Sequence, residues 1–262
     1  MQEEMISSVH NPKVKDLLAL QEKSRLRRER ALFVVEGLRE LTHCLKGGYV
    51  VDTLFVCREL LAGGLPVLPP SAHVFSVSKD VYSKIACRET TEGVVALIRY
   101  RSLRLEDLEL PDNPLVAVLE SVEKPGNLGA VLRSADAAGV DAVLVCDPLT
   151  DIYNPNLIRA SLGGVFTVPC VPCASEEAIR FLKSRGIRIL TAQLQDSELY
   201  YDCDMKGGTA IVMGTESTGL TDVWRKAADA HIRIPMLGRL DSLNVSVSAA
   251  VLLFEAVRQR NG

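Results

Sequence analysis

From residue 114 onward, the chain alternates between short apolar runs and segments with helical spacing. Nearly continuous apolar runs occupy residues 115–120, 142–146, 188–192 and 210–213. Such runs are typical of strands that are buried on both faces of a parallel sheet. Helices are predicted at 127–138, 158–162, 176–185 and 221–228, and a strand or strand-like edge at 165–171. The pattern predicts an α/β domain with a mostly parallel sheet.

The chain ends in a strand, a polar turn and a long helix. Residues 232–234 are predicted to form the strand, Pro235 ends it, and the apolar run 247–257 carries the helix. Ser242 or Asn244 is expected to cap this helix, because small polar side chains accept hydrogen bonds from its free N–H groups. The connection predicts a binding edge, and an ordinary strand-turn-helix connection is the alternative.

The first hundred residues show a similar but less regular alternation. Strands are predicted at 32–37, 50–57, 73–77 and 93–98, and helices within the first 22 residues, at 38–45 and at 81–85. This order predicts a small α/β/α sandwich. We therefore expect a front domain at 1–98, a linker of mixed charge at 99–113, and a second domain at 114–262.

The net charge of −3 gives no overall attraction to nucleic acid, so RNA binding would depend on a local patch. Residues 23–30 (KSRLRRER) carry five basic side chains and one acidic side chain. Arginine forks match phosphate oxygens, so this run is a candidate phosphate-contacting patch. A solvated helix face is the alternative.

The chain has 7 cysteines, and its first residues contain no apolar signal core. These features indicate reduced thiols and a cytoplasmic protein. Cys170-Val-Pro-Cys173 is a C-x-x-C motif without a second pair or a neighbouring histidine, and the 4 histidines show no metal-ligand spacing. No metal is expected, and a redox role for Cys170 and Cys173 is an alternative hypothesis.

Two further loops combine glycines with polar side chains directly after predicted strands. One reads SVEKPGNLGAVLR, with Asn127 at a helix start and Arg133 six residues further on; the other reads MGTESTGL, with Glu216 between two glycines. Neither is a G-x-G-x-x-G or Walker A loop. Open α/β sheets bind ligands at the carboxyl ends of their strands, which favours a site here. Helix caps and an ion pair along the helix of Arg133 are the alternatives.

Three stretches, PGNLGAVLRSADAAGV, IVMGTESTGL and IPMLGRLDSLNVSVSAAVLLFE, resemble in order and spacing the motifs of the SpoU (TrmH-type) family of RNA ribose 2′-O-methyltransferases, within the SPOUT superfamily. The similarity extends over residues 115–260. SRLRRERALFVVEG and the sandwich after it resemble the ribosomal-protein-like RNA-binding domain that many members carry in front. One departure is in the second motif, which usually reads Gly-Asn-Glu-Gly and here has Thr215 and Ser217.

The resemblance implies a deep trefoil knot in the C-terminal domain, a homodimer formed through that domain, and S-adenosylmethionine as cofactor. The cofactor-binding positions that it implies are Thr191, Ala192, Gly214, Glu216, Gly219, Ile234, Met236 and Leu243. The implied catalytic positions are Asn127, Arg133, Glu216, Ser242 and Asn244. The RNA-binding candidates in front are Lys23, Arg25, Arg27, Arg28, Arg30 and Arg39.

The implied chemistry explains these residue types. A ribose 2′-hydroxyl is a poor nucleophile, and much of the acceleration comes from aligning it with the methyl sulfonium. Arg133 holds its proton too firmly to be an easy base, so we expect it to grip the adjacent phosphate and stabilise charge on the 2′-oxygen. A deprotonated Arg133 acting as base is the alternative. Asn127, Ser242 and Asn244 would orient the ribose and the loop, and Glu216 would fix the turn or assist with the proton.

We therefore expect an S-adenosylmethionine-dependent 2′-O-methyltransferase that acts on structured RNA, with ribosomal RNA favoured by the front domain. The alternatives are a tRNA 2′-O-methyltransferase and a non-catalytic RNA-binding protein that kept the fold. A Rossmann-type nucleotide enzyme using residues 143–147 would lack its glycine fingerprint.

Overall fold

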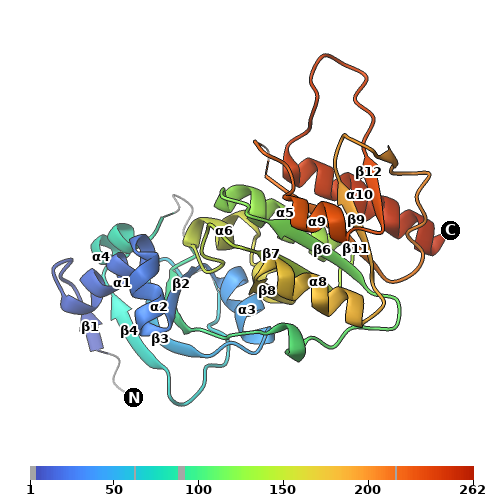
Figure 1. The fold of residues 1–262 in the computed structure, drawn as a ribbon. Coiled ribbons are helices and arrows are strands. Elements are labelled where there is room, and N and C mark those ends of the chain that lie inside the picture. The colour runs from blue at the N-terminus through green and yellow to red at the C-terminus, as the bar shows by residue number, and fades with distance from the viewer. Residues whose placement is uncertain (1–3, 62, 88–91, 216) are drawn as a thin grey trace. The chain divides into compact units, whose positions relative to one another are not determined.

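The computed structural model describes residues 4–61, 63–87, 92–215 and 217–262, so the predicted site residue Glu216 lies outside the described residues. The chain divides into two compact units, whose elements are labelled in Figure 1. The first unit contains the residues up to Ser102 together with Tyr153–Thr167. The second contains Leu103–Ile152 together with Val168–Gly262.

The first unit is built on a five-stranded mixed sheet in the order β1-β4-β3-β5-β2. β5 runs antiparallel to β3 and β2, and the other pairs are parallel. The strands are β1 (Glu4–Ile6), β2 (Leu32–Glu36), β3 (Val51–Val56), β4 (His73–Val77) and β5 (Val94–Arg99). The helices are α1 (Pro12–Glu22), α2 (Ser24–Arg30), α3 (Leu38–Lys46) and α4 (Lys79–Ile85).

Helices lie on both faces of this sheet, which confirms the predicted sandwich. On one face, α1 and α4 pack over a core that includes Leu17, Tyr82 and Val34. Phe33, the neighbour of Val34 on β2, points to the opposite face because side chains alternate along a strand. There it meets Tyr153 and Phe166, whose ring centroids lie 4.2 and 5.9 Å from its own.

The second face is completed by a segment that lies far along the sequence. Residues Tyr153–Thr167 form α6 (Pro155–Ala160) and α7 (Gly164–Thr167), and α7 packs against α3. The strand predicted from residue 165 is therefore wrong at its start, and β8 begins at Cys170. Leu162 and Gly163 have φ of 53° and 86°, which turns the chain so that Phe166 enters the aromatic cluster instead of a sheet.

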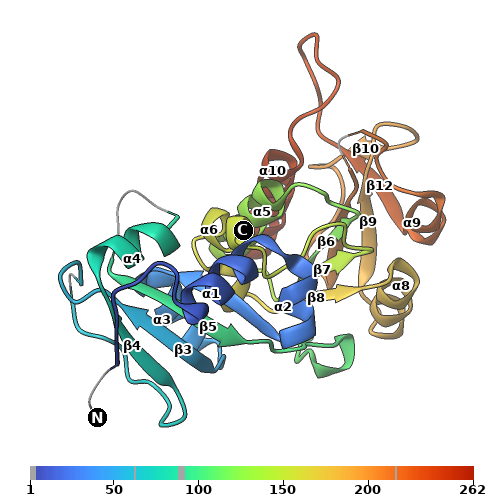
Figure 2. The ribbon, with the colours of Figure 1, turned by 90° about the vertical axis from the view of Figure 1, so that its left-hand side faces the viewer.

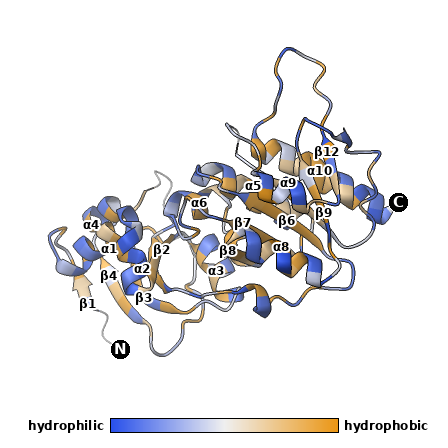
Figure 3. Cartoon of the chain, in the orientation of Figure 1, coloured by the Kyte–Doolittle hydropathy of each residue, from blue (hydrophilic) through white to orange (hydrophobic). Residues whose placement is uncertain are grey.

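The second unit is built on a seven-stranded sheet in the order β10-β12-β9-β11-β6-β7-β8. Every pairing described in it is parallel, as the continuous apolar runs predict. The strands are mainly hydrophobic in Figure 3. They are β6 (Leu115–Glu120), β7 (Ala142–Cys146), β8 (Cys170–Cys173), β9 (Arg188–Ala192), β10 (Glu198–Leu199), β11 (Thr209–Met213) and β12 (Ala230–Arg233).

Helices cover both faces of this sheet as well. Figure 2 shows α5 (Pro125–Ala137) and α10 (Val245–Asn261) on one side and α8 (Ser175–Ser184) and α9 (Asp222–Ala227) on the other. Trp224 of α9 is fully buried and donates from its indole nitrogen to Ser175 Oγ of α8, at 2.9 Å. Leu108 follows the short 3₁₀ helix Leu105–Asp107 and packs into the same core, although it lies in the stretch predicted as a linker.

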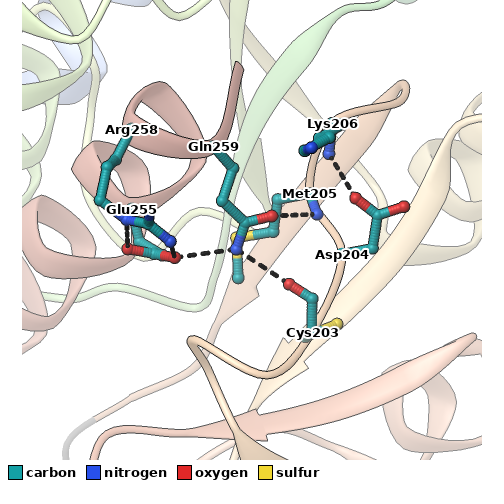
Figure 4. A network of polar contacts seen from close by, with 7 residues as sticks. All are labelled: Cys203, Asp204, Met205, Lys206, Glu255, Arg258 and Gln259. Carbon is teal, nitrogen blue, oxygen red and sulfur yellow. Dashed lines mark hydrogen bonds and ion pairs between the residues drawn. The ribbon is translucent and has the colours of Figure 1, made fainter. Parts of the chain in front are cut away.

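The last helix is held at its carboxyl end by polar contacts, some of which are shown in Figure 4. Gln259 donates to the carbonyl oxygen of Cys203 at 3.0 Å and accepts from the N–H of Met205 at 2.9 Å. Glu255 accepts two hydrogen bonds from the Arg258 guanidinium, at 2.8 and 2.7 Å. The contacts of Gln259 join the end of α10 to the segment before β11, whereas the bonds between Arg258 and Glu255 lie within the helix.

Candidate functional site

The loops after three neighbouring strands of the second unit enclose a pocket of about 340 Å³. They follow β9, β11 and β12, which are hydrogen-bonded side by side. All three strands are parallel, so their carboxyl ends meet at one edge of the sheet. A pocket therefore lies where the binding edge was predicted, and a volume near 300–1,000 Å³ is typical of small-molecule pockets.

The loop after β11 is closed by its own backbone. Thr215 N–H donates to the carbonyl of Gly219 at 3.2 Å, and Gly219 N–H donates back to Thr215 at 3.0 Å. A Cβ on Gly214 would lie 2.3 Å from the carbonyl carbon of Gly219, and Gly219 has a φ of 69°. Both positions therefore require glycine, because a side chain would collide or be strained.

Thr215, where the SpoU motif usually has Asn, contributes to this turn through its hydroxyl. The hydroxyl accepts a hydrogen bond from Thr218 N–H at 3.1 Å and lies 2.8 Å from Thr218 Oγ1. Threonine hydroxyls form such local turns in the same way as Asn side chains, though more weakly. The departure from the motif is thus compatible with a closed loop.

The loop after β12 leads into α10 and brings two predicted catalytic residues together. Asn244 is the N-cap of α10, and its Oδ1 accepts from Ser246 N–H at 3.0 Å and from Ser246 Oγ at 2.6 Å. Its Nδ2 donates to Asn127 Oδ1 at 3.2 Å. Asn127 lies in the first turn of α5, which packs beside α10. Of the two caps predicted for α10, Asn244 is the one observed.

The predicted site residues differ in how they contribute to the pocket. Ser242 lines it, whereas Asn127, Arg133 and Asn244 lie outside its lining, and Arg133 is exposed on α5. Thr191 is fully buried behind the wall, where its hydroxyl lies 2.6 Å from His231 Nδ1. The cofactor-binding candidates that line the pocket are Ala192, Gly214, Gly219, Ile234, Met236 and Leu243.

Sequence reasoning missed several lining residues, of which Gln193 and Arg225 are the most informative. Gln193 directly follows β9, so its position after a buried strand was the available signal. Arg225 lies on α9, outside the three loops. Gln193 Oε1 and Arg225 Nε are buried and have no hydrogen-bond partner among the described residues. Polar atoms of this kind fit a ligand with polar groups, since orphaned buried polar atoms are rare in proteins.

The remaining wall is largely apolar and suits a flat ring. Met213, Ile232, Ile234, Val245 and Leu252 all line the pocket. An apolar slot with exposed backbone groups at a loop edge fits the adenine of S-adenosylmethionine. The residues present therefore fit this cofactor.

The basic candidates in the first unit fall into different environments. Arg27 is 1% exposed, and its guanidinium donates to the carbonyl oxygens of Leu20 and Gln21 at 2.7 and 3.0 Å. Arg27 thus joins the end of α1 to α2 and is not available at the surface. Arg25, Arg30 and Arg39 are exposed but paired with Glu29, Asp16 and Glu40. Lys23 and Arg28 are exposed as well.

The C-x-x-C cysteines lie on β8 and form no disulfide. Cys173 Sγ lies 3.8 Å from Cys146 Sγ on β7, and all seven cysteines are free. The hydrogen bond to Cys173, followed by burial, raises the pKa of the Cys146 thiol far above its ordinary value. Burial raises the pKa of Cys170 to about 12. Redox chemistry needs a thiolate, so the raised pKa disfavours it at Cys170.

Within the described ranges, no group of three or more His, Cys, Asp or Glu side chains is placed to hold a metal ion. In the same part of the chain, no helix is long and apolar enough to cross a membrane.

Comparisons with known proteins agree with the geometry of the site. The model of the SpoU rRNA Methylase family matches residues 114–254, and that of the MRM3-like substrate binding domain matches residues 11–96. The chain is 40% identical over 195 residues to the 23S rRNA (guanosine-2′-O-)-methyltransferase RlmB of Bordetella pertussis, covering 72% of this chain and 80% of that protein. It is 29% identical over 250 residues to the 23S rRNA (guanosine(2553)-2′-O)-methyltransferase RlmP of Bacillus subtilis, covering 95% and 97%.

Solved structures of RNA methyltransferases are similar to this chain over nearly its full length. A crystal structure of an RNA 2′-O ribose methyltransferase superposes with a TM-score of 0.84 at 37% identity, covering 98% of this chain and 100% of that one. An AdoMet-bound rRNA methyltransferase from Sinorhizobium meliloti superposes with a TM-score of 0.87 at 32% identity, covering 98% of each. The resemblance drawn from the three motifs is confirmed, and the chain belongs to the SpoU rRNA methylase family.

Proposed function

We propose that this protein transfers a methyl group from S-adenosylmethionine to a ribose 2′-hydroxyl of ribosomal RNA. The observation that carries the proposal is the pocket at the ends of β9, β11 and β12, with the Asn127–Asn244 pair beside it. Family membership and the activities named for the relatives support the reaction, and the AdoMet-bound relative supports the cofactor. A cytoplasmic location is part of the proposal, because RNA and reduced thiols occur there.

The cofactor supplies an electrophilic methyl group on a sulfonium, and the chain supplies its position. Gly214 and Gly219 let the backbone approach closely, while Ile234, Met236 and Leu243 form an apolar slot for the adenine. Ala192 lines the same pocket. Thr191 does not touch the cofactor in this proposal. It supports the pocket indirectly, because its hydrogen bond to His231 joins β9 to β12 beneath the loops.

The residues at the starts of α5 and α10 bind and orient the RNA. Asn127 and Asn244 share a hydrogen bond that fixes both amides, and Ser242 adds a hydroxyl at the pocket wall. Arg133 lies further along α5 with its side chain exposed, so it is free to reach a phosphate. A guanidinium there grips the RNA backbone and stabilises charge on the 2′-oxygen. Glu216, which lies between the two glycines in sequence, is the proposed residue that assists with the proton.

RNA binding by the front unit is the next part of the proposal. Its support is the match to a substrate-binding domain, together with the exposed Lys23 at the start of α2 and the exposed Arg28 on α2. We expect phosphate contacts from these residues and from Arg25 and Arg30, whose surface ion pairs are weak enough to exchange for phosphate. Arg39 is a further candidate through its exposed side chain, although its partner Glu40 is buried.

We also propose a homodimer formed through the second unit. Val247 and Phe254 of α10 are each 47% exposed, whereas Leu252 and Leu253 belong to the core. Exposed apolar side chains on one helix favour an interface. In such a dimer, Arg133 of one subunit would approach the cofactor site of the other. Sedimentation equilibrium of Phe254→Asp should show a monomer if α10 forms the interface; an unchanged dimer would place it elsewhere.

The test of the proposed function is methyl transfer from radiolabelled S-adenosylmethionine to total RNA, followed by mapping of the 2′-O-methyl positions. We expect incorporation into 23S-type ribosomal RNA. Arg133→Ala should lower transfer by about a hundredfold or more while cofactor affinity is retained, since its contacts lie with the RNA and the developing charge.

Arg180→Ala is the matched control, because Arg180 is an exposed arginine on α8, on the other face of the sheet. Its activity should equal that of the wild type. Incorporation into tRNA alone would favour the tRNA enzyme. Cofactor binding without transfer to any RNA would favour a non-catalytic RNA-binding protein.

A further inference from the structure

Two buried polar atoms in the pocket wall are left without hydrogen bonds by the described residues. They are Gln193 Oε1, from the loop after β9, and Arg225 Nε, from α9. A buried donor or acceptor that is not paired costs free energy, so such atoms persist where a ligand or function requires them. Neither atom is explained by the adenine slot or by the RNA-facing residues.

The side chain of Arg225 is placed at the edge of the closed loop after β11. Its Nη2 lies 3.8 Å from the point where a Cβ on Gly219 would stand. Gly219 carries no side chain, so the guanidinium lies against bare backbone at the pocket wall. This position suits a ligand that approaches both the loop and the cation.

The amide of Gln193 is held in one orientation. Its Nε2 donates to the carbonyl oxygen of Gln195 at 2.9 Å, which leaves Oε1 as the acceptor without a protein partner. Gln193 therefore offers the pocket an acceptor, whereas Arg225 offers it a charged donor.

The charges of the pocket indicate which part of the cofactor the Arg225 guanidinium and the Gln193 amide oxygen bind. The charged side chains in the described lining are Arg225, Arg233 and Asp241. Arg233 already donates to Ser197 Oγ at 3.4 Å, and Asp241 accepts from Ser242 Oγ at 3.3 Å. S-adenosylmethionine has one anionic group, the carboxylate of its methionine end, next to an ammonium. The carboxylate complements a guanidinium, and the ammonium complements an amide oxygen.

We propose that Arg225 and Gln193 form the subsite for the amino-acid end of S-adenosylmethionine, with Arg225 binding the carboxylate and Gln193 Oε1 accepting from the ammonium. The inference rests on the proposed function, because it assumes the same cofactor pocket. It makes these two residues specificity determinants, which separate the full cofactor from nucleosides that lack the methionine end.

Calorimetric titration with two nucleosides tests the subsite. S-adenosylhomocysteine carries the amino-acid end, and 5′-methylthioadenosine lacks it. Arg225→Gln should weaken S-adenosylhomocysteine about tenfold or more, as loss of a charge-assisted hydrogen bond does, and change 5′-methylthioadenosine by about twofold or less. Arg225→Lys should recover part of the loss, because it keeps the charge without the fork.

Gln193→Met, of similar size but without the acceptor, should weaken S-adenosylhomocysteine binding by about threefold to tenfold and leave binding of 5′-methylthioadenosine unchanged.

Arg233→Gln is the matched control, since it removes the other lining guanidinium. A loss that is selective for S-adenosylhomocysteine in Arg233→Gln, and absent in Arg225→Gln, would overturn the assignment. Equal weakening of both nucleosides by Arg225→Gln would also overturn it, because Arg225 would then act only on pocket shape. If the wild-type protein binds neither nucleoside, the cofactor pocket itself fails, whereas unchanged affinity for S-adenosylhomocysteine in both Arg225→Gln and Gln193→Met rejects the subsite alone.

Discussion

At the residue scale, one amide side chain links the start of α10 to Asn127, a predicted catalytic residue. Asn244 accepts from Ser246 N–H through Oδ1 and donates to Asn127 through Nδ2. The first contact is an ordinary N-cap, which any short polar acceptor supplies. The second needs a donor, which Asp lacks. The two contacts can therefore be separated by substitution.

Asn244→Ala should lower the free energy of unfolding by about 1 kcal/mol, because the cap of α10 is lost. Asn244→Asp should keep that stability but lose methyl transfer nearly as fully as Asn244→Ala, because a carboxylate would face Asn127 Oδ1. Denaturant titration followed by Trp224 fluorescence gives the stability, and radiolabel incorporation gives the activity. An Asp variant with wild-type activity would show that the contact with Asn127 is dispensable.

A second residue-scale feature makes stability depend on pH. Glu255 is 9% exposed, and the hydrogen bonds from Arg258 hold its pKa below the ordinary 4.5. A folded-state pKa below the unfolded one gives stability that is complete above about pH 4.5 and is lost as the pH falls through the folded value. We expect Glu255→Gln to cost about 1–2 kcal/mol at pH 7.

The cost of Glu255→Gln should shrink as the pH is lowered below about 4.5, because the unfolded carboxylate is then protonated first and the folded one only below its lower pKa. Urea titrations of both proteins at pH 7 and at about pH 3.5 measure it. A difference that stays constant between the two pH values would mean that the ion pair with Arg258 contributes nothing to folding.

At the element scale, the segment Tyr153–Thr167 completes the first unit from a distant part of the chain. The ring of Tyr153 stacks on Phe33 at 9°, and its hydroxyl donates to the carbonyl oxygen of Arg101 at 2.6 Å. Without this segment, Phe33 of β2 would lose its contacts with Tyr153 and Phe166 and keep those with Tyr49 and Tyr100. The family match for the front domain stops at residue 96, so it does not include this segment.

Tyr153→Ala should therefore destabilise the first unit by about 3 kcal/mol, since a buried aromatic ring is removed. Tyr153→Phe keeps the ring and should cost about 1 kcal/mol, for the lost hydroxyl bonds. Hydrogen exchange of peptides from β2 and α3 measures the loss of protection. Trp224, the one tryptophan of the chain, lies in the second unit, and its fluorescence is the internal reference. Unchanged hydrogen exchange in Tyr153→Ala would mean that the segment does not stabilise the first unit.

At the scale of the whole molecule, an acidic chain must bind a polyanion. With a net charge of −3, binding rests on local cations, and salt should weaken it in proportion to the phosphates contacted. Lys23→Ala with Arg28→Ala should lower the slope of log affinity against log salt concentration by about 1.5, for two lost contacts.

Arg27→Ala separates charge from structure in the same helix. Arg27 is buried and bonded to the end of α1, so its loss should lower the stability of the first unit by about 2 kcal/mol and leave the salt slope unchanged. Filter binding of ribosomal RNA at several salt concentrations measures the slopes, with Arg180→Ala as the neutral control. A slope that falls as much for Arg180→Ala would show that binding follows net charge.

Elements that depend on residues close to them in sequence could be predicted from the sequence, and elements that depend on distant residues could not. β6, β7, β9 and the helix capped by Asn244 follow from apolar runs and from one polar side chain, which act within a few residues. The strands β1 and β10 have 3 and 2 residues, too few to show a period, so partners across the sheet decide them. α7 formed where a strand was predicted, because its Phe166 packs in the aromatic cluster of the first unit.

The residues of the candidate site also divide into those that could be predicted from the sequence and those that could not. The three motif loops were identifiable from the sequence, because glycines and polar residues after buried strands mark a ligand edge, and most of the candidate cofactor residues do line the pocket. Arg225 was not, since only the packing of α9 brings it to the wall, and Gln193 was missed although it directly follows a buried strand. The trefoil knot and the homodimer stay predictions. The sequence by itself determined strands, caps and motif chemistry, whose causes are local; tertiary structure decided which distant side chains share a surface, because burial depends on what the rest of the chain covers.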